Sequence, residues 1–335
     1  METQKIKNKA LELGYVECSV IPASVFEEYS KYLDERIKAF PESKELYEPF
    51  YAFARPHENG RSVIVCIRRY GKYKAPDVLK GIIGKVYMFD GRVPYSREYR
   101  AKLEFEAYLG TLGMKVLQKE LPARWAAAKA GLGKFGHNNF IYHKEHGSYI
   151  WIDTWTVNKE LDYDDMPEDS SLSACNENCH KCVKACPTNA LSNTFCMNMG
   201  KCVTNVLGFS IDVPEKDIRS KLGLWIYGCD ACQDACPLNK GKFNGTEDFP
   251  LLKEYEEYLK PENILKMDEE TYLNVINPRF WYAGKDGLWL WKCNALRHMI
   301  NSELSEYHQL IKQYCNDPDS RIKEMARWGR DKLNL

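Results

Sequence analysis

Two cysteine runs dominate the chemistry that this sequence can support. The first, CNENCHKCVKACP, covers residues 175–187, and the second, CDACQDACP, covers residues 229–237. Both contain the spacing C-x2-C-x3-C-P of bacterial ferredoxins, in which three thiolates on a tight loop bind one cluster and the cysteine before proline binds its partner. Proline ends each loop because it fixes φ and lacks a backbone donor. The two runs therefore predict a pair of 4Fe–4S clusters.

Two cubane clusters need eight thiolates, and the two runs contain seven. The eighth should lie between them, where Cys202 is the favoured candidate and Cys196 the alternative. Cys175 is the least regular ligand, because three residues rather than two separate it from Cys179. A zinc ribbon or a disulfide scaffold is the competing interpretation, and His180 is expected to be solvated or to support a ligand rather than to bind metal. In ferredoxins the cysteine before each proline binds the cluster of the other run. The same exchange here assigns to one cluster Cys175, Cys179, Cys182 and Cys236, and to the other Cys186, Cys202, Cys229 and Cys232.

The composition is that of an ordinary globular protein. The 335 residues are 44% hydrophobic and 28% charged, and the length allows two or three domains. No apolar run reaches the roughly 18 residues needed to span a bilayer, and the first residues lack the hydrophobic core of an export signal. Thirteen cysteines in such a chain indicate reduced thiols and metal binding, so we expect a cytoplasmic protein. The cysteines outside the cluster set are expected to be buried small hydrophobes: Cys18, Cys66, Cys196, Cys293 and Cys315.

Charge is balanced over the whole chain but not along it. Lys plus Arg and Asp plus Glu number 47 each, which gives no overall signature of nucleic-acid binding. Residues 61–102, however, contain eleven Lys or Arg against three Asp or Glu, with tyrosines between them. Such a stripe can hold phosphates, RNA or a large polar cofactor. The alternative is a solvated helix face over core tyrosines.

Hydrophobic periodicity predicts an α+β fold in three regions. Residues 1–165 are predicted to be an α/β domain, residues 166–247 a cluster-binding region of loops and short helices, and residues 248–335 a helical tail. Paired helices in this tail are similar to a HEAT-like repeat. The expected strands of the first region are near 15–21, 61–70 and 148–157, and its expected helices near 1–14, 96–119 and 121–133.

A glycine-rich stretch, AGLGKFGHNNFIYHKEHGSYIWI, precedes the first cysteine run and lets the backbone approach something large and flat. Gly131, Gly133 and Gly136 nearly form the motif G-x-G-x-x-G. They follow a predicted helix rather than a strand, and no acidic residue lies at the expected distance downstream, so a dinucleotide site is disfavoured. The side chains of Asn138 and Asn139 offer donors and acceptors that suit an amide-rich or phosphate-bearing ligand.

These motifs resemble those of the epoxyqueuosine reductases, corrinoid and iron–sulfur enzymes of tRNA modification. That family has a motif close to AGLGWxGKN…GS, then CxxCxxCxxxCPT, then a lone cysteine and YGCDxCQxxCPWN. This chain has AGLGKFGHN, GSY, CHKCVKACPTNAL, CVTNV and YGCDACQDACPLN in the same order. The distance from Cys202 to Cys229 fits the family's lone cysteine, which is why Cys202 is preferred to Cys196. Since PYSREYRAKL is also similar to the family's GRDYH segment, the resemblance covers most of the chain.

The resemblance implies a nitroreductase-like cobalamin-binding domain, a ferredoxin-like module with two 4Fe–4S clusters and a HEAT-like helical tail that docks substrate. Electrons would pass from an external low-potential donor of the ferredoxin or flavodoxin type through both clusters to cobalt. Cobalt(I) would then drive a two-electron reduction of substrate, which for this family is epoxyqueuosine in tRNA, while a nearby acid supplies the proton. No membrane partner is expected.

The same resemblance implies roles for single residues. Tyr95, Arg97 and Tyr99 fall where the family keeps polar groups facing cobalt, and a tyrosine there would act as an acid only with a lowered pKa. The family's catalytic aspartate has no clean match, Glu120 is the nearest acid, and His137 replaces the family's lysine. Because both departures fall at the active site, the substrate need not be epoxyqueuosine in tRNA. The expected cobalamin contacts are Gly131, Gly133, Gly136, His137, Asn138, Asn139, Tyr142 and Ser148.

Two other interpretations stay open. A double-cluster ferredoxin-type electron-transfer protein would feed another protein and would need neither an organic cofactor nor a proton donor. It would leave the glycine- and asparagine-rich stretch without a ligand to justify its cost in stability. A reductase with another organic cofactor is the second possibility, and flavin is the natural candidate in a nitroreductase-like domain.

Overall fold

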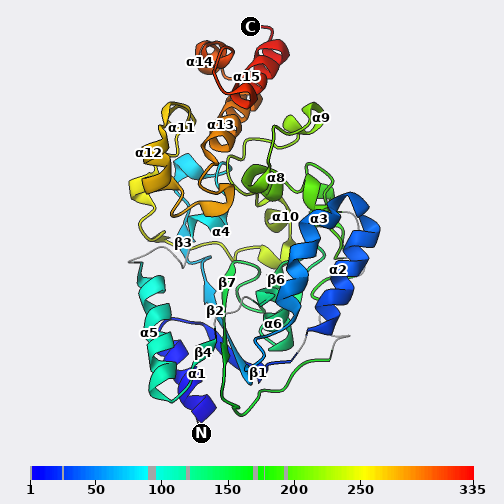
Figure 1. Ribbon diagram of the computed structural model, residues 1–335, viewed down its shortest axis with the longest axis vertical. Coiled ribbons are helices and arrows are strands. Elements are labelled where there is room, and N and C mark those ends of the chain that lie inside the picture. Colours follow the sequence, from blue (N-terminus) through cyan, green and yellow to red (C-terminus); the bar gives the residue numbers. More distant parts are fainter. Residues whose placement is uncertain are drawn as a thin grey trace.

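An antiparallel sheet of four strands forms the centre of the N-terminal region (Figure 1). The strands lie in the order β1 (Glu17–Pro22), β2 (Ser62–Arg69), β7 (Ile150–Val157) and β4 (Val116–Leu117). In β2, Ile64 opposes Val20 of β1 and Trp155 of β7. The three strands expected near 15–21, 61–70 and 148–157 are thereby confirmed. The computed structural model describes residues 2–24, 26–89, 96–117, 121–168, 173–176, 178–191 and 195–335.

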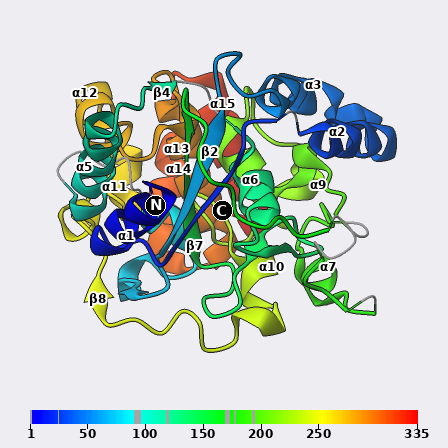
Figure 2. The same cartoon turned by 90° about the horizontal axis from the view of Figure 1, so that it is seen from below.

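Four helices cover the two faces of this sheet: α1 (Glu2–Glu12), α5 (Arg97–Thr111), α2 (Glu27–Ala39) and α6 (Ala123–Lys129). Side chains alternate along β2, so Ile64 and Cys66 pack against α1 and α5. Val63 and Val65 point the other way and pack against α2 and α6. Both faces of β2 are apolar because both are covered, and the result is a three-layer region with the sheet in the middle (Figure 2).

Two helices end earlier than the sequence predicts, in both cases near a glycine. The expected helix over 96–119 stops at Thr111, because Gly113 adopts a φ of 75° and turns the chain toward β4. The expected helix over 121–133 stops at Lys129, just before Gly131 with a φ of 71°. Glycine adopts this left-handed conformation without a Cβ penalty, so it commonly ends helices. After Gly131 the chain forms a hairpin of β5 (Lys134–Phe135) and β6 (Ile141–Tyr142).

The cysteine runs lie on loops that lead into very short helices. α7 (Lys181–Ala185) lies within the first run, and α10 (Ala231–Asp234) lies within the second. These two helices are in contact, and Figure 2 shows them on the same side of the molecule. α8 (Val203–Phe209) begins directly after Cys202. Two runs that are far apart in the sequence are therefore side by side in space.

Three C-terminal helices pack on one another at the end of the molecule away from the sheet (Figure 1): α13 (Leu288–Ser302), α14 (His308–Tyr314) and α15 (Ser320–Leu333). In α15, Ile322, Met325 and Ala326 are buried and form an apolar stripe along one side of the helix. From α13, Asn294 donates to the carbonyls of residues 207 and 226, and Arg297 to those of residues 223 and 225. α13 thereby holds the segment that leads into the second cysteine run.

A segment of the N-terminal region belongs to the C-terminal core. Tyr70 and Phe89 pack in the same hydrophobic cluster as Trp291 of α13. In addition, β3 (Tyr73–Lys74) pairs in parallel with β8 (Glu247–Asp248). The predicted limits of the three regions, at residues 165 and 247, stay predictions. Contacts between residues 70–89 and the C-terminal core cross both limits.

The mixed arrangement of helices and sheet agrees with the α+β class predicted from the sequence. Among the described residues, no helix combines the length and the apolar composition that crossing a membrane requires. The remaining helices are α3 (Lys44–Tyr47), α4 (Lys85–Met88), α9 (Lys216–Arg219), α11 (Pro261–Lys266) and α12 (Glu269–Thr271), followed by a π-helical turn over Tyr272–Ile276.

Candidate functional site

The thiols of the eight predicted cluster ligands form two groups of electrostatic neighbours. In the first group, burial together with the charges of Cys175 and Cys236 raises the pKa of Cys182 to about 11. Burial also raises the pKa of Cys175, and the charges of Cys236 and Cys179 add to that effect. These four thiols therefore lie within reach of one another's charge.

More protein surrounds the second group than the first, although Cys182 of the first group is the one buried thiol among the eight. Burial, with the charges of Asp230, Cys202 and Cys186, raises the pKa of Cys229 to about 12. Burial also raises the pKa of Cys232 well above its usual value; Cys229 and Cys202 add to this shift, and Cys182 of the first group adds least. This partition into two groups of four is the one that crossed ligation of two cubane clusters requires.

Cys196, the alternative eighth ligand, belongs to neither group. Besides burial, the charges that shift its pKa come from Arg36 and Glu35. Cys202, by contrast, has the Cys186 thiol as a neighbour. Within the part of the chain that the structure describes, no three His, Cys, Asp or Glu side chains converge on one ion-sized position, which a zinc site would need. The chemistry of the donor set, eight thiols in two groups, fits 4Fe–4S clusters, and the assignment of single ligands stays a prediction.

Backbone N–H groups point at several of these thiols. The nitrogen of His137 lies 3.3 Å from Cys175 Sγ, and that of Ala190 lies 3.2 Å from Cys186 Sγ. Hydrogen bonds to sulfur favour the thiolate form that binds iron, and they tune the reduction potential of a bound cluster. Folding alone thus prepares both groups for metal.

The glycine-rich stretch forms a tight hairpin rather than an open cradle. A Cβ at Gly133 would lie 2.5 Å from Ile141 Cγ2, and a Cβ at Gly136 would lie 2.4 Å from the Tyr142 ring. Real Cβ contacts are longer than this, so both positions need glycine for the hairpin to close on itself. Gly131 differs, because a Cβ there would clash with nothing and would make one ordinary contact, with Pro167 Cδ at 3.9 Å. Its left-handed φ of 71° is what favours glycine at this position.

Buried polar side chains of the same stretch reach the two cysteine runs. Asn138 donates from Nδ2 to the carbonyl oxygen of Cys232 at 3.3 Å. His137 Nδ1 lies 2.9 Å from the carbonyl oxygen of Cys179. Because each run receives one of these bonds, the hairpin braces both runs against the sheet. Both side chains were predicted from the sequence to contact cobalamin. Their position just before the first cysteine run was the sequence feature that pointed to a structural role.

Two further residues of the stretch contact the second run, and a third faces elsewhere. Ser148 Oγ donates to Gln233 Oε1 at 2.8 Å. Burial, followed by a hydrogen bond with Cys236, raises the pKa of the Tyr142 hydroxyl. Asn139 lines a separate cavity of about 310 Å³ beside α2. The eight expected cobalamin contacts therefore do not face one common space.

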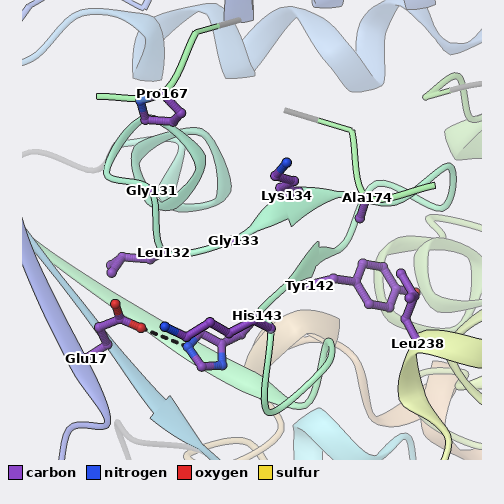
Figure 3. Close-up of a pocket in the computed structure, with 11 residues that line it drawn as sticks. Glu17, Gly131, Leu132, Gly133, Lys134, Tyr142, His143, Pro167, Ala174 and Leu238 are labelled. Carbon is purple, nitrogen blue, oxygen red and sulfur yellow. Dashed lines mark hydrogen bonds and ion pairs between the residues drawn. The ribbon is translucent and has the colours of Figure 1, made fainter. Parts of the chain in front are cut away.

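Three of the expected cobalamin contacts, Gly131, Gly133 and Tyr142, line one cavity of about 390 Å³ (Figure 3). On the wall that β1 provides, Glu17 Oε2 lies 2.8 Å from Nε2 of the buried His143, as the dashed line in Figure 3 marks. Such a pair can hold a proton beside a bound molecule. This pair was not predicted from the sequence, because 126 residues separate the two partners. The two histidines of HKEH, directly after the hairpin, were the feature that could have drawn attention to it.

The expected catalytic residues are not beside the hairpin. Tyr95 and Glu120 lie outside the described residues. Arg97 and Tyr99 begin α5, and Arg97 Nη2 lies 3.5 Å from Glu247 Oε2. α5 covers the face of the sheet opposite to α6 and the hairpin, as both ribbon views show (Figures 1 and 2). The structure therefore does not bring Arg97 and Tyr99 together with the glycine-rich stretch.

Arg97 instead lines a polar cavity of about 650 Å³ in which cations and carboxylates are mixed. Lys72 and Arg68 contribute to the same wall, and the Arg68 guanidinium stacks 3.6 Å from the centre of the Tyr15 ring. Much of the basic stretch 61–102 thus surrounds a cavity and is balanced locally by carboxylates, so it is not simply a solvated helix face.

Comparison with known proteins agrees with this geometry. Residues 174–239 match a family model described as a 4Fe-4S double cluster binding domain, so this region is a domain for two iron–sulfur clusters. The epoxyqueuosine reductase of Bacillus subtilis (strain 168) is 34% identical over 224 residues, which are 64% of this chain and 54% of that enzyme. The epoxyqueuosine reductase of Cyclobacterium marinum is 26% identical over 250 residues, 71% and 79% of the two chains. The chain is a homologue of the epoxyqueuosine reductases. Its match spans about half the length of the Bacillus relative.

Solved structures of epoxyqueuosine reductases share the fold. One from Bacillus subtilis aligns over 98% of this chain and 90% of that chain, with a TM-score of 0.76 at 23% identity. A structure of epoxyqueuosine reductase with an epoxyqueuosine-modified tRNA-Tyr stem loop aligns over 99% and 90%, with a TM-score of 0.75 at 22% identity. The resemblance seen in the motifs is confirmed, and it extends over nearly the whole chain.

Proposed function

We propose that this chain is an iron–sulfur reductase that passes electrons through two 4Fe–4S clusters to cobalamin and reduces its substrate by two electrons. The observation that carries the proposal is the pair of thiol groups, four in each, within a fold matched over 98% of the chain by an epoxyqueuosine reductase. Two clusters in series are an electron relay, and a relay in a reductase needs an acceptor at its inner end.

Electrons enter at the first thiol group in this proposal, because that group lies nearer the surface. Cys179 lines an open surface depression together with the exposed side chains of Lys181 and Lys184. Their positive charge favours a donor with an acidic surface, which we infer to be a low-potential protein of the ferredoxin or flavodoxin type. The second group then receives electrons deeper inside.

Cobalamin is proposed to contact the cavity of Figure 3. Gly131 supports this placement, because it lines the cavity and adds no side chain to it. Bound cobalamin would supply a low-valent cobalt that delivers two electrons to the substrate. Among the residues of the cavity, His143 accepts backbone N–H bonds from Glu145 and His146 at Nδ1, so its Nε2 carries the proton that it donates to Glu17. That proton is held where a reduced substrate would need one.

Epoxyqueuosine in tRNA is the proposed substrate. The observation that supports it is one solved structure of the same fold that contains an epoxyqueuosine-modified tRNA-Tyr stem loop. Tyr95, Arg97, Tyr99 and Glu120 stay the catalytic residues proposed from the resemblance, and Arg97 and Tyr99 lie across the sheet from the cavity of Figure 3. The finer architecture belongs to the same proposal: a nitroreductase-like domain over 1–165, a ferredoxin-like domain over 166–247 and a HEAT-like tail over 248–335.

A double-cluster electron-transfer protein without cobalamin is the second candidate. The observation that favours it is the role of the hairpin, whose Gly133 and Gly136 close on their own neighbours and whose Asn138 binds the second cysteine run. The packing of the hairpin therefore explains why these residues are present without any bound ligand.

Titration with hydroxocobalamin separates the two candidates. The protein is purified anaerobically, its iron and sulfide are reconstituted, and visible and EPR spectra are recorded before and after dithionite. We expect about eight irons per chain and a base-off cobalt(II) signal that saturates at one corrin per chain. Epoxyqueuosine-containing tRNA is then added, and loss of the epoxide is followed by mass spectrometry of the nucleosides. Clusters without retained corrin would leave the electron-transfer protein or a flavin enzyme as the function.

A further inference from the structure

The cavity beside α2, of about 310 Å³, is separate from the cavity of Figure 3 and has walls of a different kind. Apolar and aromatic side chains form most of it, including Tyr29, Phe50 and Trp125. Tyr32, next to the cavity, packs on Trp125 with their ring centres 5.0 Å apart, which fixes the orientation of that ring. The polar groups in the lining are few, and their arrangement indicates the ligand.

Two arginines enter this cavity and are held together by one residue. Arg36 donates from Nη2 to Oδ1 of Asn139 at 2.5 Å, and Arg124 donates from Nη1 to the carbonyl oxygen of Asn139 at 2.7 Å. Asn139 adopts a φ of 64°, a conformation that asparagine tolerates better than most residues. The left-handed turn presents its side chain and its carbonyl to the two guanidinium groups at once.

No carboxylate of the described residues forms an ion pair with Arg36 or Arg124. Arg36 donates from Nε to the carbonyl oxygen of Phe195 at 3.1 Å, a neutral acceptor that leaves its charge in place. The surrounding protein lowers the pKa of Arg124, and the charge of Arg36 lowers it further. The side chain of Arg124 is exposed, so its charge is accessible to a ligand.

The side chain of Asn139 is enclosed by protein. It is 5% exposed, and its Nδ2 makes no hydrogen bond to any described residue. The cavity therefore offers a ligand the two guanidinium groups, which are donors that a phosphate or carboxylate accepts from.

We propose that this cavity binds an anionic group, a phosphate or a carboxylate, carried on a flat aromatic body. The anion would offset the repulsion between Arg36 and Arg124 and accept hydrogen bonds from their guanidinium groups, while the body would lie against the aromatic side chains. The charge of Arg124 also lowers the pKa of the Cys202 thiol, so the cavity adjoins the second thiol group. The ligand would therefore bind beside the inner end of the electron relay. This inference does not depend on cobalamin or on tRNA.

Calorimetric titration of the full-length, cluster-reconstituted protein with phenyl phosphate tests the inference. We expect one binding site per chain, with binding weakened at least tenfold in Arg124→Gln and in Arg36→Gln. Arg330→Gln is the matched control, because Arg330 lies on α15 and pairs with Asp331 at the surface, and it should bind as the unaltered protein does. Benzyl alcohol, which keeps the ring and lacks the charge, should not bind measurably.

Benzoate, titrated in parallel, identifies which anion the cavity prefers, and tighter binding of either anion supports the proposal. If Arg124→Gln fails to retain its clusters, Arg124→Lys keeps the charge and changes only the geometry, and it should bind phenyl phosphate with an affinity between those of the unaltered protein and Arg36→Gln. Absence of binding, equal binding by the three glutamine variants, or equal binding of benzyl alcohol would each overturn the inference.

Discussion

The first thiol group lies beneath an open depression of the surface, whereas the second lies against an apolar core. Around the first, Cys179 shares its depression with Lys181 and Lys184. Around the second, Cys229 packs against buried Val203 and other apolar side chains of α8. The two cysteine runs share one spacing, so local sequence does not set this difference.

A repeated ligand motif can therefore serve two functions, electron exchange with a partner and electron transfer inside the protein, when the surrounding structure differs. A cluster near the surface exchanges electrons with a partner protein. A cluster with fewer water dipoles around it is less able to stabilise the added negative charge on reduction, so we expect the second group to have the lower reduction potential of the two. Transfer from the first cluster to the second would then be uphill, and it needs the low-potential donor that the proposed function names.

Removal of one deep ligand is the most drastic way to test that the groups are separate. We expect Cys229→Ser to lose one cluster, so that iron falls from about eight to about four per chain. Cys196→Ser, the matched control, should keep about eight, because Cys196 neighbours no thiol of either group. Iron and sulfide analysis of anaerobically reconstituted protein measures both. Equal iron content in the two variants would remove the distinction between Cys196 and the deep group.

Reversal of charge at the shallow group sharpens the contrast in function. Lys181→Glu combined with Lys184→Glu should slow reduction of the clusters by an acidic ferredoxin about tenfold at low ionic strength, and the difference should shrink as salt screens the charges. Stopped-flow absorbance at the cluster band measures the rate. Lys253→Glu, also at an exposed position but outside this depression, should react at the unaltered rate. A slow rate in all variants, or in none, would show that electrons enter elsewhere.

The hairpin brace gives a smaller effect. Asn138→Ala removes a buried amide that bonds to Tyr142 and to the Cys232 carbonyl, and we expect it to lower the free energy of unfolding by about 1–3 kcal/mol. Urea unfolding of the reconstituted protein measures the loss. Asn263→Ala removes an exposed amide and should cost much less. Comparable losses at the two positions would argue against the brace.

Titration of His298 has the smallest expected effect. This histidine lies on α13, the helix that holds the segment leading into the second cysteine run. Burial lowers the pKa of His298, whose Nδ1 bonds to the carbonyl of Leu224. Because the unfolded chain binds the proton more readily, stability is kept above the usual histidine pKa of about 6.5 and is lost as the pH falls below it. We expect a loss of less than about 1.4 kcal/mol per pH unit from this group. His298→Gln should flatten the dependence, and an unchanged slope would remove His298 as its source.

Much of the cluster region could be predicted from the sequence, because its ligands are local. The spacing within each run, such as that between Cys229 and Cys232, is set by a few residues of loop, so it survives any tertiary arrangement. The strands around β2 could also be predicted, because a short continuous apolar run between charged flanks is typical of a buried strand.

The role of the glycine-rich stretch could not be predicted in the same way. Gly133 and Gly136 look alike whether a cofactor or a neighbouring ring occupies the space beside them, and the distinction depends on Ile141 and Tyr142 in the folded hairpin. The pair of Glu17 and His143, and the two arginines that Asn139 holds, join residues more than ten positions apart. Only tertiary structure brings such residues together, so no window of the sequence contains the signal.

The position of residues 70–89 has a consequence for the biosynthesis of the protein. Their pairing partner Glu247 lies 174 positions after Tyr73, and the helices that bury them follow later still. At a translation speed of about 5–20 residues per second, this segment waits roughly 10 to 35 s on the ribosome before its partner strand exists. Both cysteine runs emerge during that interval, into a chain whose core cannot yet close. The order of synthesis therefore leaves the thiols accessible before folding covers them, and a chain truncated before α13 could not bury residues 70–89 as the full chain does.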